Sequence, residues 1–307
     1  MKVAIIGSGA MGSIYGAAFY DARNEVLFVD ANRELVDAVN ERGMIIERKD
    51  GEHTYRIPAT NKPAGHDPCD LLLFQVKGFQ TRAAAEFARP LVNEGTLILS
   101  LQNGLGNCET LAEAYPDSEI LAGNNVGSVT VVAPGHVNHT GVGPTYIGPF
   151  RGSDTTSAQR AANALAPSGF EVHVLADVKT QIWRKLLINC ALLGAAALTG
   201  LDANGLAKRG PVLDLANNVL RETITIAETD GCSFDPDEEI AKMYHIVSHA
   251  GGKSSMLQDV EAGRRTEIDS ISGAAMRVAE QYGVPCPLNT TIWSLVKGKE
   301  QAMGIES

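Results

Sequence analysis

Short apolar runs alternate with segments of helical periodicity in the first half of the chain. Residues 2–6 and 25–29 have the apolar, β-branched character of buried strands. Each is followed by a segment with apolar residues at helical spacing, residues 10–21 and 33–42. This alternation is typical of βαβ units, and it predicts a parallel sheet covered by helices.

The pattern continues to about residue 174 with more varied elements. Residues 70–75 and 96–100 predict further buried strands, with a helix at 80–88 between them. Residues 44–47 and 54–57 flank Asp50-Gly51, a hairpin turn signal, and predict an inserted hairpin to which the sequence assigns no role. Glycines and prolines punctuate four further runs, which predict that the sheet ends in antiparallel strands: residues 119–122, 128–133, 136–139 and 145–147.

The second half changes character. From Asp177 onward the apolar residues recur only at helical spacing, with breaks at Gly200, Gly210-Pro211 and Asp235-Pro236, and again at 251–252 and 285–287. We therefore expect an α/β protein with a Rossmann-type domain at residues 1–176 and an all-helical domain at 177–307. A length of 307 residues, about twice the roughly 150 typical of one domain, fits this division. A ligand is expected in the cleft between two such domains.

The composition of the chain disfavours some classes of binding partner and some kinds of covalent or metal site. Lys and Arg number 26 against 36 Asp and Glu, and the net charge of −10 disfavours nucleic acid and anionic membranes as partners. The cysteines are spread out without a C-x-x-C pair, which argues against disulfides and a structural metal: Cys69, Cys108, Cys190, Cys232 and Cys286. The N-terminal apolar run, residues 3–6, is too short for a signal sequence, so we expect a cytoplasmic location.

A glycine-rich motif follows the first predicted strand. The G-x-G-x-x-G pattern comprises Gly7, Ser8, Gly9, Ala10, Met11 and Gly12. It lies between a strand and a helix, where such glycines allow a tight turn, close approach of a pyrophosphate and helix-on-strand packing. The motif predicts a dinucleotide site, and a strand-to-helix turn that binds no ligand is the alternative.

Asp30 ends the second predicted strand. An acid about 20 residues after the glycine motif accepts hydrogen bonds from the adenosine ribose, and it repels a 2′-phosphate. Asp30 therefore favours NADH, although the nearby Arg33 is the kind of residue that accommodates NADPH. The alternative is that Asp30 only caps the next helix.

Two polar residues follow other predicted strands. Lys77 comes after residues 70–75, and Asn103 after 96–100. Residues just past the carboxyl ends of parallel strands line the ligand crevice, so both are candidates for cofactor or substrate contacts. The alternatives are a solvated loop lysine and a simple Asn-Gly turn.

Four residues of the helical half are candidates for the chemistry. Lys185 and Asn189 are spaced i and i+4, so they share a helix face that is otherwise largely apolar. An ammonium there needs a partner or a wet cleft. Ser255 is a candidate for holding a substrate carboxylate, and Glu267 for pairing with a cation. Helix caps explain both equally well, because Thr266-x-x-Asp269 has the pattern of a helix N-terminus with acidic first-turn residues.

Taken in order, the motifs GSGAMG, VKGFQ, LQNGLGN, HTGVGPTYIG, WRKLLIN and SSMLQDVEAGRRTEID resemble those of the ketopantoate reductases (2-dehydropantoate 2-reductases) over nearly the whole chain. The resemblance implies reduction of 2-dehydropantoate to pantoate in pantothenate biosynthesis, with NADPH bound to a Rossmann domain. It further implies that Lys185 is the general acid, and that Glu267 contacts cofactor or substrate. Cofactor contacts are implied for Lys77, Gln80 and Asn103, substrate contacts for Asn103, Asn189 and Ser255, and a homodimer is a further expectation.

The sequence departs from the family pattern in two places. Leu193 and Gly194 stand where the family has a second asparagine followed by proline, and Asp30 stands where NADPH-using members present a basic residue. The missing asparagine helps to bind the substrate hydroxyl, so Leu193 favours a 2-oxo acid with a less polar tail. The alternatives are therefore an NADH-linked reductase of another small 2-oxo acid, or a dinucleotide sensor without turnover.

Overall fold

The computed structural model describes residues 1–141, 143–249 and 251–305. Position 142, within the HTGVGPTYIG motif, and the last two positions of the predicted helical domain lie outside this description. The chain divides into two compact units, one of Met1–Gln102 with Asn107–Gln181 and one of Asn103–Gly106 with Ile182–Ser307. The division falls inside a long helix, a few residues beyond the 176/177 boundary expected from the sequence.

The strands of the first unit carry the following bounds: β1 (Lys2–Ile6), β2 (Glu25–Val29), β3 (Met44–Arg48), β4 (Gly51–Tyr55), β5 (Ala59–Thr60), β6 (Leu71–Phe74), β7 (Leu97–Ser100), β8 (Ile120–Asn125), β9 (Ser128–Ala133), β10 (His136–Gly141), β11 (Thr145–Pro149) and β12 (Val172–Val174). Its helices are α1 (Ala10–Asp21), α2 (Arg33–Arg42), α3 (Thr81–Ala88), α4 (Asn107–Ala114) and α5 (Thr156–Leu165).

The main sheet has the strand order β12-β11-β8-β7-β6-β1-β2-β5. The strands from β8 to β5 run parallel, which confirms the predicted parallel sheet. β11 is antiparallel to β8, as expected for the end of the sheet, and β12 runs parallel to β11. The carboxyl ends of β1, β2, β6 and β7 therefore share one edge, where ligands bind in open α/β sheets.

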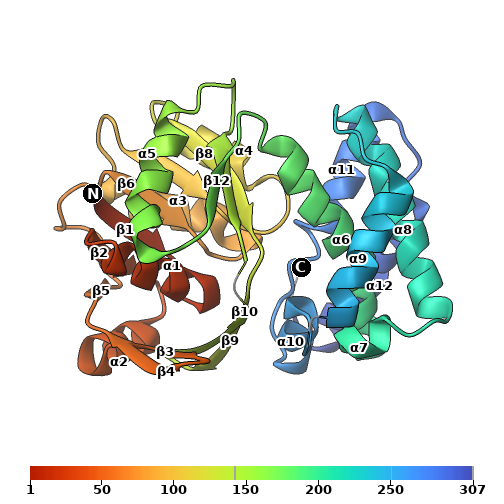
Figure 1. Ribbon diagram of the computed structural model, residues 1–307, viewed down its shortest axis with the longest axis horizontal. Coiled ribbons are helices and arrows are strands. Elements are labelled where there is room, and N and C mark those ends of the chain that lie inside the picture. Colours follow the sequence, from red (N-terminus) through yellow and green to blue (C-terminus); the bar gives the residue numbers. More distant parts are fainter. Residues whose placement is uncertain (142, 250, 306–307) are drawn as a thin grey trace. The chain divides into compact units, whose positions relative to one another are not determined.

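Both faces of this sheet are buried, as in other parallel sheets. Val3 and Ile5 of β1 point to the face covered by α1 and α5, whereas Ala4 and Ile6 point to the face covered by α3 and α4 (Figure 1). Because successive side chains of a strand alternate between faces, apolar residues at every position give β1 two cores. β1 is therefore held firmly within the sheet, and the glycine motif begins directly after its carboxyl end.

A second, four-stranded sheet was not anticipated. Its order is β4-β3-β10-β9, so the predicted strands at 128–133 and 136–139 join the hairpin rather than ending the main sheet. The hairpin itself turns at residues 49–50, and its second strand begins at Gly51, earlier than the predicted residue 54. β3 offers an edge to which β10 adds in parallel, a pairing that the local pattern does not encode.

Helices are the only regular secondary structure among the described residues of the second unit, which confirms the expectation for this half. The helix that enters it, α6, is long and apolar enough to cross a membrane by length and composition alone, but core helices pass the same test. Trp183, Leu187 and Cys190 of α6 are fully buried in the helical core. The bounds are α6 (Lys179–Thr199), α7 (Ala203–Leu206), α8 (Pro211–Thr229), α9 (Pro236–His249), α10 (Ser255–Glu261), α11 (Ser272–Tyr282) and α12 (Pro287–Ala302).

Candidate active site

The glycine motif forms the turn between β1 and α1. Gly7 has φ of +91°, and a Cβ there would lie 2.7 Å from Val76 Cγ1. A Cβ on Gly12 would lie 1.9 Å from the carbonyl oxygen of Gly7. Both positions therefore require glycine to let the turn and the helix pack.

Gly9 differs from its two neighbours in the motif. A Cβ at Gly9 would meet nothing within 4 Å, so packing within the protein does not explain a glycine there. Gly9 also precedes the first turn of α1 without a side-chain cap. The first backbone N–H groups of a helix need acceptors, and they attract anions. The open space and these donors fit a pyrophosphate group.

Asp30 is tied to the glycine motif. Its Oδ2 accepts hydrogen bonds from the Ser8 backbone N–H (2.8 Å) and from Ser8 Oγ (3.3 Å). Asn32, not Asp30, caps α2 by accepting from the Leu35 N–H at 3.3 Å. The capping alternative for Asp30 is therefore wrong, and its carboxylate lies beside the loop that the dinucleotide motif forms.

Lys77 lies at the carboxyl end of β6, and it begins a short 3₁₀ turn that ends at the exposed Gln80. A buried residue that the sequence analysis did not single out, Gln102, anchors this exit. Gln102 Nε2 donates to the carbonyl oxygen of Val76 (2.9 Å) and to Thr81 Oγ1 (2.8 Å). A polar side chain two residues beyond the buried strand β7 is the signal that could have identified Gln102.

Lys185 is a half-buried residue of α6, and Asn189 follows one turn later. Desolvation lowers the pKa of Lys185 from 10.5 to about 8, and the charge of Glu267 opposes this shift. The structure thus brings Lys185 and Glu267 together in the helical unit, although they lie far apart in sequence. An ammonium that titrates near neutral pH is suited to acid–base chemistry.

Glu267 is buried in a turn segment and not in a helix. α11 begins only at Ser272, so the prediction that Thr266-x-x-Asp269 opens a helix is wrong. The physical reason is a tertiary contact: the buried carboxylate of Glu300 accepts from the Thr266 N–H (2.7 Å) and Oγ1 (2.6 Å). These bonds satisfy Thr266 without a helical turn.

Asn103 begins a loop, residues 103–106, that belongs to the helical unit. Gly104 has φ of +84°, and a Cβ there would lie 1.9 Å from the Ser270 carbonyl oxygen, which also accepts from the Leu105 N–H at 3.1 Å. Asn103 therefore stands near the segment that carries Glu267. Ser255 is exposed in the first position of α10, whereas its neighbour Ser254 provides the cap by accepting from the Leu257 N–H.

One of the two departures from the family pattern, Leu193-Gly194, lies on α6. Leu193 is half-buried against the helical core. Gly194 is buried, and a Cβ there would lie 2.3 Å from Ile292 Cγ2 of α12. Gly194 therefore permits close packing of two helices, while Leu193 adds apolar surface one turn beyond Asn189.

The four-stranded sheet brings together three groups of metal-binding type. Ligand atoms of Glu47, Glu52 and His136 lie within 4.8 Å of one another, and His136 Nε2 contacts Glu47 at 2.9 Å. Acidic side chains gather commonly at protein surfaces without an ion, so we assign no metal to this group. The sequence spacing did not indicate it because the residues come from three separate strands.

Comparison with known proteins settles the family. The model of the family "Ketopantoate reductase PanE/ApbA" matches residues 3–152, and that of its C-terminal part matches residues 177–300. This chain belongs to the ketopantoate reductase family. As a member of it, the protein is an NAD(P)-dependent oxidoreductase.

Full-length relatives support the same assignment. The 2-dehydropantoate 2-reductase of Archaeoglobus fulgidus is 31% identical over 303 residues, covering 98% of this chain and 99% of the relative. That of Halobacterium salinarum is 30% identical over 299 residues, covering 97% and 98%.

Solved structures of similar proteins include two kinds of enzyme. A 2-dehydropantoate 2-reductase from Geobacter metallireducens is 30% identical, with a TM-score of 0.91 and coverage of 97% of this chain and 99% of that one. A ternary structure of D-mandelate dehydrogenase with NADH and anilino(oxo)acetate is 27% identical, with a TM-score of 0.95 and coverage of 99% and 100%. The fold therefore occurs with more than one oxo-acid chemistry.

Proposed function

We propose that this protein reduces the 2-oxo group of 2-dehydropantoate to give pantoate, the reduction that pantothenate biosynthesis requires, with Lys185 as the general acid. The observation that carries the proposal is the half-buried Lys185, whose pKa lies near 8 beside the carboxylate of Glu267. The family and its full-length relatives support the same reaction.

The sheet unit holds the residues for the cofactor. The open space at Gly9 and the donors of the first turn of α1 suit the pyrophosphate, and Asp30 suits the ribose hydroxyls. Lys77 and Gln80 lie at the exit of the neighbouring strand β6, and we propose that they contact the cofactor. When bound, a reduced nicotinamide dinucleotide supplies the hydride that the carbonyl carbon accepts.

Lys185 completes the reduction with a proton. As the carbonyl carbon gains a hydride, its oxygen acquires negative charge, which a neighbouring ammonium stabilises and then protonates. A pKa near 8 leaves Lys185 mostly protonated at pH 7 and still able to release its proton. Glu267 maintains this balance, because desolvation alone would lower the pKa further.

The substrate carboxylate and tail need additional contacts. Asn189 shares the α6 face of Lys185, and Asn103 lies near the Glu267 segment. We propose that both donate hydrogen bonds to substrate oxygens, and that the exposed hydroxyl of Ser255 at the start of α10 binds the carboxylate.

Two residues favour a second candidate function, in which the substrate is a different 2-oxo acid. Leu193 places an apolar side chain one turn beyond Asn189, and Asp30 disfavours a 2′-phosphate. The similar D-mandelate dehydrogenase structure carries NADH and an oxoacetate with an aromatic group. An NADH-linked reductase of 2-oxo acids with apolar tails is therefore the second candidate function.

The decisive experiment measures loss of absorbance at 340 nm with 2-dehydropantoate, with aliphatic 2-oxo acids and with phenylglyoxylate, each with NADH and with NADPH. A higher kcat/KM for 2-dehydropantoate than for the other acids supports the first function. A preference for phenylglyoxylate or a branched aliphatic acid supports the second. Binding of NADH without turnover of any of these acids contradicts both, and indicates the sensor that the sequence left open.

We also propose a cytoplasmic location and a homodimer. Among the described residues, which include all five cysteines, no disulfide forms, as is usual in a reducing compartment. Light scattering of the purified chain tests the dimer, and fractionation of cells tests the location.

A further inference from the structure

One face of α12 contacts the segment that carries Glu267. Trp293, Lys297 and Glu300 are spaced i, i+4 and i+7, so they lie on one side of the helix. Their partners are Thr266 and Asp269, which lie on either side of Glu267 in the sequence.

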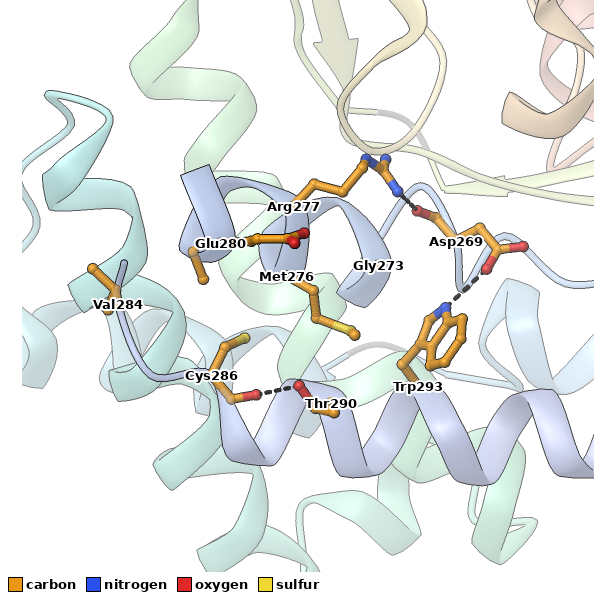
Figure 2. A pocket seen from close by; sticks show the side chains of 10 residues that line it. Asp269, Gly273, Met276, Arg277, Glu280, Val284, Cys286, Thr290 and Trp293 are labelled. Atoms are coloured by element: carbon orange, nitrogen blue, oxygen red, sulfur yellow. Dashed lines mark hydrogen bonds between the residues drawn. The ribbon is translucent and has the colours of Figure 1, made fainter. Parts of the chain in front are cut away.

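Asp269 is held on the C-terminal side of Glu267. The Trp293 indole N–H donates to Asp269 Oδ1 at 2.8 Å, a bond drawn in Figure 2, and Lys297 Nζ donates to Oδ2 at 3.2 Å. Arg265 also donates to Oδ2, at 3.2 Å. Burial alone raises the pKa of Asp269, but these donors outweigh it and lower the pKa from 3.8. Asp269 is therefore a carboxylate at neutral pH.

Thr266 is held on the N-terminal side. The side chain of Glu300 is 2% exposed and accepts from both the backbone N–H and the hydroxyl of Thr266. Lys297 Nζ lies 2.9 Å from Glu300 Oε2 and 3.2 Å from Asp269 Oδ2, so a single ammonium joins the two attachments. Charge-assisted hydrogen bonds of this kind are stronger than neutral ones, and they fix geometry.

We propose that this face of α12, formed by Trp293, Lys297 and Glu300, is a positioning element that keeps Glu267 beside the amine of Lys185. The inference rests on the proposed role of Lys185 as the acid. None of the three residues is assigned contact with substrate or cofactor. Their effect passes through the backbone between Thr266 and Asp269, which they hold at both ends.

Other charged groups surround the segment. Arg264 pairs with Asp259 of α10 at 3.0 Å, and Arg277 of α11 donates to the Asp269 carbonyl oxygen at 3.1 Å. Glu267 is the charged group whose field raises the pKa of Lys185. A looser segment thus weakens the effect of the Glu267 charge on Lys185, and it leaves Lys185 easier to deprotonate.

Trp293→Phe is the mildest way to loosen the attachment. It removes the indole donor but keeps an aromatic ring, and Asp269 retains Arg265 and Lys297 as partners. Trp293 also lines a pocket of about 380 Å³, shown in Figure 2. The smaller phenyl ring therefore enlarges an existing pocket and does not clash with its neighbours. Lys297→Met breaks the link between the two attachments, and Lys297→Arg restores a cation. Lys299→Met is the matched control because Lys299 lies on another side of α12.

The test follows the Lys185 ammonium by NMR titration of its 13Cε signal, in protein with 13C-labelled lysine and without substrate. Lys185→Arg identifies the signal by its loss. We expect Trp293→Phe and Lys297→Met to lower the pKa of Lys185 by roughly half a unit or more, and Lys297→Arg and Lys299→Met to leave it near the wild-type value. Turnover should fall by about 10-fold in the first two variants, while the Kd for NADH stays within about twofold.

The outcomes are separable. A wild-type titration curve in Trp293→Phe overturns the proposal, and this variant serves if Lys297→Met does not fold. A shifted Lys185 pKa with lower kcat supports it, because a loss of stability alone does not move this titration. If the wild-type protein turns over no 2-oxo acid and the pKa still shifts, the positioning role stands and the proposed function fails.

Discussion

The backbone N–H and the hydroxyl of Ser8 both donate to the same carboxylate oxygen of Asp30, at 2.8 and 3.3 Å. Ser8, the second residue of the glycine motif, is thereby joined to Asp30, the first residue after β2, with α1 between them in the sequence. The two features for which we propose dinucleotide binding, the glycine loop and the Asp30 carboxylate, are thus joined directly by hydrogen bonds.

Asp30→Ala is expected to weaken NADH and to favour NADPH, because the carboxylate that repels a 2′-phosphate is gone. The ratio of kcat/KM for NADH to that for NADPH should fall by about 10-fold or more. Glu94→Ala, which removes an exposed carboxylate in the turn before β7, is the control and should leave the ratio unchanged. An unchanged ratio in Asp30→Ala would remove this residue from cofactor selection.

Gly9→Ala should fold normally yet bind NADH poorly. Its Cβ enters space that is open in the protein, so the free energy of unfolding should change by less than about 1 kcal/mol. Gly12→Ala should instead fail to fold or lose most of its stability, because its Cβ would lie 1.9 Å from Gly7 O. Thermal melts with and without NADH separate the two effects, and full NADH stabilisation of Gly9→Ala would argue against a pyrophosphate at this position.

Lys185→Ala should reduce kcat by roughly 100-fold or more, the range for losing a general acid, with little change in the Kd for NADH. Lys208→Ala, an exposed lysine of the same unit, provides the control. Stopped-flow measurement of a single turnover identifies the chemical step as the one affected. Full turnover in Lys185→Ala would exclude this residue from proton transfer.

The pH dependence of reduction should follow the titration of Lys185. The acid is active when protonated, so kcat should be flat below pH 7 and fall as the pH rises through about 8. Glu267 raises this pKa, and Glu267→Gln should therefore move the falling limb to lower pH. A limb that moves to higher pH in Glu267→Gln would contradict the assigned sign.

Gln102→Leu should loosen the exit of β6. The substitution leaves the Val76 carbonyl and the Thr81 hydroxyl without their amide donor, which costs about 1–3 kcal/mol of stability. NADH affinity should fall with it, because Lys77 follows Val76 directly. Gln159→Leu, on the exposed side of α5, is the comparison for urea unfolding and NADH titration. Equal affinities in both variants would confine Gln102 to a purely structural role.

Local pattern determined much of the fold. The strands at 2–6 and 25–29 and the helices at 10–21 and 33–42 have the predicted bounds. Glycine and polar residues separate apolar runs of strand length from longer segments of helix length, so the chain itself marks where each element ends. Proline and glycine likewise predicted the helical half, since they end helices through their own backbone preferences.

Pairing between distant segments was decided only in three dimensions. The sequence showed strands at 128–139 but not that β10 lies parallel to β3, since a strand carries no record of its partner. The turn at Thr266 has the same origin, because the buried Glu300 supplies the acceptor that a helix would otherwise provide.

For the candidate site, too, some features were predictable from the sequence and others were set only by the tertiary structure. Residue type and position along each element were enough to select Gly9, Asp30 and Lys185, and their roles in binding and catalysis stay predictions. The nearness of Glu267 to Lys185, the bond between Ser8 and Asp30 and the face of α12 behind Glu267 come from tertiary packing alone. Hydrogen bonds and charge interactions depend on distances of a few ångströms, and only the folded chain sets those.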